Sequence, residues 1–421
     1  MTYDSFATAN AALLWTVFLI SVVVGAVVNK TNFCTMGAMS DWVNIGDKGR
    51  FRAWMLALAV ALIGVVLLER AGLVNVGAAF PPYRAGQLIW AENLLGGLLF
   101  GAGMTLASGC GNKTLVRIGG GNLKSVVVLL VIAAIAYFMV NPFPGTDQTL
   151  FTLLFFHWIR PLAIDVGAGQ DLGTLVAGSE HAATARTAIG LVLGLLLLIF
   201  VFRSSEFRRS FDNLLGGLAV GLAVLGAWYV TSTIHIDVEG TTYTLQSYAQ
   251  DWDFLAESSE GKPADSRPLA PQSFTFINPM GQTLGYALAG FKPAYLTFGV
   301  AALGGVVLGS FLWALLTGSF RIEWFASFQD FLNHLVGAVL MGFGGVLALG
   351  CTIGQGVTGV STLALGSFIA LGGILLGSAL AMKVRYYRMV YEGQAGFLAA
   401  LVTALVDLRL LPAAMRRLEA V

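Results

Sequence analysis

The sequence predicts an all-α integral membrane protein, with about nine transmembrane helices and short re-entrant half-helices arranged in two inverted, pseudo-symmetric repeats. Three observations predict this fold class. Of the 421 residues, 57% are hydrophobic and only 11% are charged, a balance that soluble domains do not need to build a core. Nine apolar segments are long enough, or nearly so, to cross a bilayer. A glycine-rich segment that ends in cysteine occurs twice.

A hydrocarbon core about 30 Å thick requires about 20 apolar residues per helix. The predicted spans are 11–28, 52–68, 87–108, 124–140, 186–201, 213–231, 293–316, 329–349 and 364–382. The stretch 396–411 is shorter and contains Asp407 and Arg409, so we interpret it as an interfacial or docked helix. The first apolar run has no basic segment before it and no small-residue cleavage site after it, which indicates a retained span.

The distribution of Lys and Arg predicts the orientation in the membrane. With the N-terminus outside, 17 of the 24 basic residues fall in cytoplasmic loops and 7 fall outside. Because cytoplasmic loops carry the positive excess, we expect a bacterial inner-membrane protein with its C-terminus in the cytoplasm. The net charge of +1 gives no electrostatic support for nucleic-acid binding.

An internal repeat organises the chain. Residues 93–110 align without gaps on residues 334–351 and are identical at nine positions, which include the cysteines. A fainter similarity relates residues 34–37 to 278–281. We expect one transmembrane domain, 1–421, with a first repeat at 11–140, a connecting segment with one transmembrane helix at 141–212, a second repeat at 213–383 that contains an outer polar insert at 234–273, and a cytoplasmic-side C-terminal segment at 384–421. The repeats begin by crossing in opposite directions, so they are inverted.

Inverted repeats with interrupted helices indicate a transport site near the membrane midplane. The segments after Cys34, Cys110, Asn278 and Cys351 are too short to span, so we interpret them as re-entrant. Glycine near the cysteines permits left-handed or tightly turned backbone, and a helix that begins after such a break favours an anion. The candidate substrate-binding residues are Cys34, Cys110, Cys351, Gly109, Gly111, Asn112, Lys113, Gly350, Thr352, Gln355 and Asn278.

A thiol suits a path for a sulfur-containing anion. It is polarizable and a weak donor, so it can bind a sulfur atom without preventing release. The alternative is that these cysteines are only small buried hydrophobic residues. Lys113 could neutralise an anion near Cys110, or it could serve only as a topology signal. The three cysteines form no CxxC and no four-ligand zinc pattern, so we expect no metal and no cofactor.

Three segments resemble the YeeE/YedE family of membrane proteins. They are the sequence around Cys34 (Asn-Phe-Cys-Thr-Met-Gly-Ala), that around Cys110 (Leu-Ala-Ser-Gly-Cys-Gly) and that around Cys351 (Leu-Gly-Cys-Thr-Ile-Gly-Gln-Gly). The resemblance implies an hourglass-shaped monomer of nine transmembrane helices that takes up thiosulfate through transient hydrogen bonds to the three thiols. It also implies a small cytoplasmic sulfur carrier of the TusA-like type as a partner. We expect no such domain within these 421 residues.

The leading hypothesis is therefore a transporter for thiosulfate, which is not an enzyme. Transport of selenium species or of another reduced sulfur species remains an alternative. A membrane thiol-disulfide enzyme would need a pair of nearby cysteines. A soft-metal transporter would need clustered Cys, Met or His ligands. Met36 and Met104 lie near cysteines in the sequence, but no cluster of His joins them.

Overall fold

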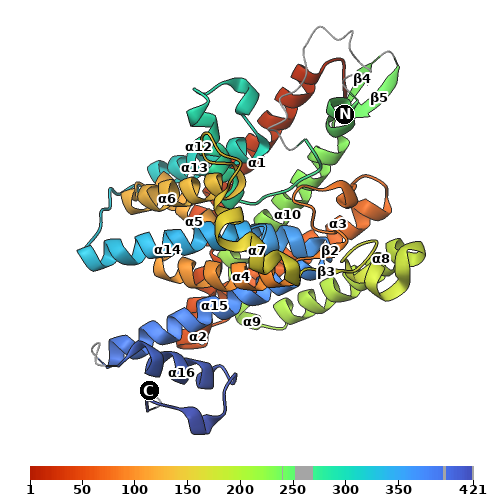
Figure 1. The fold of residues 1–421 in the computed structure, drawn as a ribbon. Coiled ribbons are helices and arrows are strands. Elements are labelled where there is room, and N and C mark those ends of the chain that lie inside the picture. Colours follow the sequence, from red (N-terminus) through yellow and green to blue (C-terminus); the bar gives the residue numbers. More distant parts are fainter. Residues whose placement is uncertain (239, 252–268, 392–394, 420–421) are drawn as a thin grey trace.

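The computed structural model describes residues 1–238, 240–251, 269–391 and 395–419, and Figure 1 shows their arrangement. In this described part, nine segments are helical, long and apolar enough to cross a membrane, which confirms the nine predicted spans. They are Phe6–Ile45, Gly49–Arg70, Trp90–Gly119, Leu123–Val140, Leu172–Phe202, Phe211–Thr233, Phe298–Leu316, Phe328–Leu347 and Leu365–Val390.

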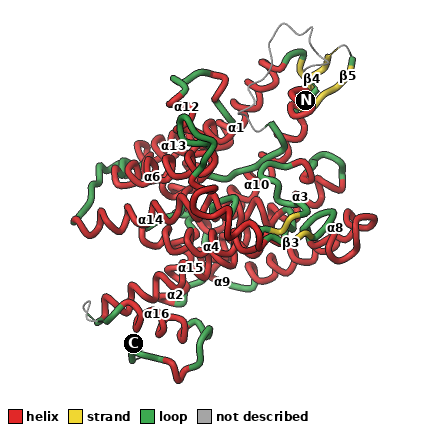
Figure 2. Tube along the Cα trace, viewed as in Figure 1, coloured by secondary structure: helices red, strands yellow, loops and turns green. Residues whose placement is uncertain are grey.

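Helices account for most of the chain (Figure 2). Before residue 141 they are α1 (Phe6–Thr31), α2 (Thr35–Ile45), α3 (Gly49–Arg70), α4 (Trp90–Leu106), α5 (Gly111–Gly119) and α6 (Leu123–Val140). Then come α7 (His157–Ile159), α8 (Leu172–Phe202) and α9 (Ser205–Arg209). The remaining ones are α10 (Phe211–Thr233), α11 (Leu245–Gln250), α12 (Ile277–Leu288), α13 (Phe298–Leu316), α14 (Phe328–Leu347), the π-helical turn η6 (Gly354–Gly359), α15 (Leu365–Val390) and α16 (Phe397–Asp407). Two small sheets pair β1 (Thr2–Tyr3), β4 (His235–Val238) and β5 (Thr241–Thr244), and β2 (Gln87–Leu88) with β3 (Ile164–Asp165).

The helix starts differ in a way that matters for function. Several long helices begin at a side chain that accepts a hydrogen bond from a first-turn amide. These caps are Ser5, Asn122, Asp171, Ser210, Thr297 and Ser327. The short helices α2, α5 and α12 begin without a side-chain cap hydrogen bond. Their first-turn N–H groups are therefore left for another partner.

Helices α4 and α14 touch backbone to backbone at the centre of the molecule. A Cβ on Gly103 would lie 2.6 Å from the carbonyl oxygen of Gly337, and one on Gly344 would lie 2.6 Å from that of Gly96. The two reverse contacts are 2.7 Å each. Residue 96 meets 344 and residue 103 meets 337, so the helices cross antiparallel with reciprocal contacts. Only glycine permits this approach.

The surrounding helices pack in matched pairs. In one matched set, α15 packs on α4 and α6 packs on α14. In the other, α1 packs on α13 and α10 packs on α3. Helix α8 packs on the outside of α3. We predicted that α8 begins at residue 186, but it begins at Leu172. Gly178 interrupts it with φ of 68°, and Glu180 and His181 follow, so the first turns lack the apolar run by which a span is detected.

The two chain termini lie at opposite ends of the molecule, near β4 and near α16 (Figure 1). Helix α16 docks on α15, as the sequence suggested for 396–411, and the Tyr387 hydroxyl donates to Asp407 Oδ2 at 2.7 Å. The predicted polar insert 234–273 holds β4, β5 and α11, while its residues 239 and 252–268 lie outside the described residues. We call the two ends the α16 face and the β4 face.

The α4–α14 crossing predicts a steep cost for one added methyl group. Gly103→Ala should destabilise the protein by about 1 to 3 kcal/mol, because the new Cβ overlaps a backbone carbonyl that cannot move aside. Gly372→Ala in α15 is the matched control, since its Cβ would meet nothing within 4 Å. Thermal unfolding of the purified protein measures both. Equal midpoints for the two variants would contradict the backbone contact.

Candidate transport site

Each cysteine stands directly before a short helical segment. Cys34 is the N-cap of α2 and Cys110 is the N-cap of α5, while Cys351 precedes a helical stretch at 352–361. All three are free thiols, and they are 7%, 2% and 0% exposed. The segments predicted as re-entrant are therefore short helices, and a buried thiol marks the start of three of them.

The left-handed backbone at these breaks is not where we expected it. We expected glycine near the cysteines to permit it, but at the breaks the residues with positive φ are Asn32 (51°), Ser108 (58°) and Leu349 (59°). Each lies two positions before a cysteine. A side chain in this conformation costs roughly 1 to 2 kcal/mol, so the helix ends are held in strained turns that aim the thiols inward.

The structure brings the thiol-bearing segments together. The Cys34 and Cys110 side chains lie against each other, although 76 positions separate them in the sequence. The Thr352 side chain lies next to the Cys110 thiol, and Cys351 is its neighbour in the chain. The Cys351 sulfur accepts a hydrogen bond from the Gly354 amide at 3.4 Å. The segments that carry the three thiols therefore meet in one buried region, which we call the thiol cluster.

Buried oxygens without a partner surround this cluster. In the described part of the chain, side-chain oxygens of five residues near the helix starts are buried and make no hydrogen bond. They belong to Thr35, Asn112, Thr275, Thr352 and Gln355. Leaving a buried polar atom unpaired costs roughly 1 to 3 kcal/mol. Unpaired oxygens of this kind beside uncapped helix starts are typical of a polar site that can take up a water molecule or an anion.

The other predicted site residues lie as follows. Lys113 Nζ donates to Asn32 Oδ1 at 3.1 Å, which ties the first turn of α5 to the bend before Cys34. Gly111 is the first residue of α5, and a Cβ there would meet Ile277 at 3.1 Å. The Gln355 amide donates to the Ala348 carbonyl.

Asn278 lies half-buried in the first turn of α12. The residues just before it border the thiols instead. The Phe276 backbone and the Thr275 side chain both lie beside the Cys351 sulfur.

Sequence reasoning missed Thr275, although the repeat contained the signal. Cys110 and Cys351 differ by 241 positions, and 34 plus 241 gives 275. Thr275 therefore lies beside Cys351 as Cys34 lies beside Cys110. The weaker similarity between Cys34 and Asn278 led us to a different register.

A charged cluster holds the end of the 352–361 segment. The Arg84 Nε donates to the Thr362 carbonyl at 2.8 Å, and its other nitrogens bind both Glu69 oxygens at 2.5 and 2.9 Å. Arg186 forms ion pairs with two carboxylates, with 3.6 Å between its Nε and Glu69 Oε1 and 3.3 Å between its Nη1 and Asp171 Oδ1. Burial alone would raise the pKa of Asp171, but hydrogen bonds from Thr174 and the nearby arginines hold it below its usual value. These charges fix the segment from outside the thiol cluster.

Nine apolar spans around a buried cluster of thiols, uncapped helix starts and unpaired oxygens define a membrane transport protein. Comparison with known families agrees. The family model described as sulphur transport matches residues 30–380, and this chain belongs to that family, which corresponds to the YeeE/YedE resemblance. Among the described residues, no group of three or more His, Cys, Asp or Glu side chains could hold a metal ion.

Two curated relatives cover most of the chain. The thiosulfate transporter TsuA of Escherichia coli (strain K12) is 25% identical over 381 residues, which cover 86% of this chain and 92% of that protein. The thiosulfate transporter TsuA of Spirochaeta thermophila is 25% identical over 372 residues, covering 87% of this chain and 97% of that protein.

The contact between Cys34 and Cys110 predicts selective oxidation. Treatment with diamide should convert these two thiols into one disulfide and leave Cys351 free, because only neighbouring thiols can pair. Titration of free thiols in denaturant should fall from three to one. The Cys351→Ala variant should also lose two thiols, whereas Cys34→Ala and Cys110→Ala should lose none. Loss of the Cys351 thiol, or no loss of any thiol, would contradict the contact between Cys34 and Cys110.

Proposed function

We propose that this protein takes up thiosulfate across a bacterial inner membrane, without acting as an enzyme, along a path formed by Cys351, Cys110 and Cys34. In this proposal the N-terminus is outside and the α16 face is cytoplasmic. The observation that carries the proposal is the contact between Cys34 and Cys110, which Thr352 extends to Cys351. The anion would meet one thiol after another.

The reciprocal contacts between α4 and α14 support two inverted repeats. A twofold rotation that exchanges the repeats would carry the contact between Gly96 and Gly344 onto that between Gly337 and Gly103. It would also carry the pair of Cys34 and Cys110 onto the pair of Thr275 and Cys351. Inverted repeats place equivalent groups on opposite sides of the midplane, as a two-sided path requires.

Weak donors suit passage of a dianion better than fixed charges. The uncapped starts of α2 and α5 offer partial positive charge, and the thiols offer soft, weak hydrogen bonds to a sulfur atom. Neither interaction is strong enough to trap the ion. Two cations lie close enough to Cys34 to act on its thiol, Lys113 and Arg117, and Lys113 is bound to Asn32. Arg84, outside the thiol cluster, is bound to Glu69. The proposed path is therefore attractive to anions but does not retain them.

The family and the names of its two relatives support thiosulfate as the substrate. Selenium oxyanions or another reduced sulfur species would use the same weak donors, so competition against labelled thiosulfate separates these substrates. A TusA-like sulfur carrier would receive the imported sulfur at the α16 face.

One observation favours a second function. A thiol-disulfide enzyme needs two neighbouring cysteines, and Cys34 and Cys110 lie against each other although no CxxC is present. Such an enzyme would depend on these two residues and not on Cys351. A transport path depends on all three, so Cys351 distinguishes the two functions.

Growth on thiosulfate tests the path. A bacterium without other thiosulfate importers, given this protein and thiosulfate as sole sulfur source, should grow, and Cys110→Ala or Cys351→Ala should abolish growth at unchanged membrane abundance. Gly372→Ala, which adds a methyl group in open space, should grow normally. Undiminished growth of both cysteine variants would remove the path. Loss with Cys110→Ala alone would favour the redox function.

Thr275 should behave as the counterpart of Cys34. Thr275→Val keeps the shape of the side chain but removes the hydroxyl next to Cys351. We expect thiosulfate uptake to fall about tenfold, which corresponds to the loss of one hydrogen bond worth about 1.4 kcal/mol. Thr275→Ser keeps the hydroxyl and should retain most of the rate. The measurement is initial uptake of labelled thiosulfate. Equal rates for Thr275→Val and the unchanged protein would exclude a role for this hydroxyl.

A further inference from the structure

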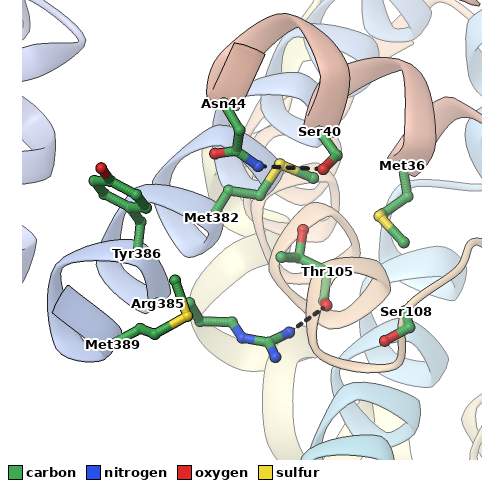
Figure 3. Close-up of a pocket in the computed structure, with 9 residues that line it drawn as sticks. All are labelled: Met36, Ser40, Asn44, Thr105, Ser108, Met382, Arg385, Tyr386 and Met389. Atoms are coloured by element: carbon green, nitrogen blue, oxygen red, sulfur yellow. Dashed lines mark hydrogen bonds between the residues drawn. The ribbon is translucent and has the colours of Figure 1, made fainter. Parts of the chain in front are cut away.

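A cavity of about 470 Å³ opens between α2, the end of α4 and α15 (Figure 3). We call it the methionine vestibule. Its lining residues are Met36, Ser40, Asn44, Thr105, Ser108, Met382, Arg385, Tyr386 and Met389. Helix α2 contributes residues four apart and α15 contributes residues three or four apart, so one face of each helix forms a wall. The vestibule is therefore lined mainly by one face of α2 and one face of α15.

The methionine vestibule adjoins the proposed path. Met36 lies two residues after Cys34, and Ser108 lies two residues before Cys110. Ser108 is also one of the residues held in left-handed backbone. An anion that leaves the Cys34 and Cys110 thiols towards the α16 face would enter this space.

Arg385 supplies the charge of the vestibule. One of its nitrogens donates to the Thr105 carbonyl at 2.9 Å, as Figure 3 shows, and in the described part of the chain its other N–H groups have no protein partner. The lining contains no carboxylate. Asp41, on the same helix as Met36, is bound to Arg50 at 2.5 and 2.6 Å. The vestibule therefore carries a net positive charge with donors free to bind an oxyanion.

The three methionines supply the second kind of contact. Thioether sulfur is soft and polarizable, and it packs well against another soft sulfur atom. Three methionines could also bind a soft metal cation. The guanidinium group of Arg385 in the same cavity opposes a cation and favours an anion. The hydroxyl and amide of Ser40 and Asn44, 3.2 Å apart, add adjustable polar contacts.

We propose that the methionine vestibule is a second binding site, which holds an anion with oxygen atoms at one end and a reduced sulfur atom at the other. Arg385 binds the oxygen end, and Met36 faces the sulfur end. The site receives the anion from the thiols before release at the α16 face. This inference rests on the proposed function, because it takes the permeant from the same path.

Equilibrium binding of labelled thiosulfate to the purified protein tests the vestibule. Arg385→Gln should weaken binding at least tenfold, because it removes a charge-assisted hydrogen bond, and Arg385→Lys should recover part of the loss. Arg388→Gln is the matched control, since Arg388 is an exposed residue of α15 outside the lining. Thermal midpoints of the variants exclude loss of folding. Unchanged binding by Arg385→Gln would overturn the proposal.

Sulfate tests the role of the methionines, since it has oxygen atoms but no reduced sulfur atom. Unlabelled sulfate should displace labelled thiosulfate from the unchanged protein at least tenfold less effectively than unlabelled thiosulfate does. The Met36→Leu variant should show a smaller difference between the two anions. Equal displacement by both anions would overturn the soft-sulfur contact.

The vestibule and the thiol path can fail independently. In Cys110→Ala, transport should be lost while binding that depends on Arg385 remains. If the unchanged protein supports no growth on thiosulfate but binds it through Arg385, the proposed function fails and the site stands. If growth requires the cysteines but binding is indifferent to Arg385, the vestibule proposal fails and the function stands.

Discussion

The backbone contact between α4 and α14 is the constraint on which the rest of the structure depends. Glycine at residues 96, 103, 337 and 344 lets the two helices cross with carbonyl groups close to the opposing Cα atoms. Both helices end a few residues before a cysteine, so the crossing determines where the two breaks lie relative to each other. Any side chain at the crossing would separate the helices and move the turns of Ser108 and Leu349 apart. The position of the thiols is thus set by residues that never touch them.

Local sequence patterns were sufficient for the elements of the fold. Nine apolar runs predicted nine spans, because the hydrophobic length that a bilayer requires is a property of each segment alone. The short segments after Cys34, Cys110 and Cys351 were also predictable, since glycine and polar residues interrupt the apolar runs there. The first turns of α8 were missed because Gly178 and the polar residues after it hide a helix that tertiary contacts stabilise.

Long-range contacts were less predictable. The pairing of Cys34 with Cys110 joins residues from separate helices, and no local pattern encodes it. The left-handed residues Ser108 and Leu349 contradicted the usual preference for glycine, because the surrounding helices hold a turn that the residues themselves disfavour. The offset of 241 residues between the repeats predicts Thr275 as the counterpart of Cys34. A threonine by itself is common in membrane helices, so its residue type gives no sign of a site until its contact with Cys351 is known. The cluster of Arg84 and Glu69 also depends on distant contacts.

The rigid and the movable parts of the site are separate. The three thiols are at most 7% exposed, so passage along the proposed path would require some element to move. Helices α4 and α14 are poor candidates, because their backbones are in direct contact and any shift would cause overlap. The short helices α2 and α12 have no side-chain cap. Ile277, the first residue of α12, lies beside both Gly111 and Gly345, which belong to the two cysteine-bearing halves. Displacement of such a side chain would connect the two ends of the cluster while the crossing stays fixed. For the proposed function, a fixed crossing with short helices around it would let the path open while the cysteine breaks keep their relative positions.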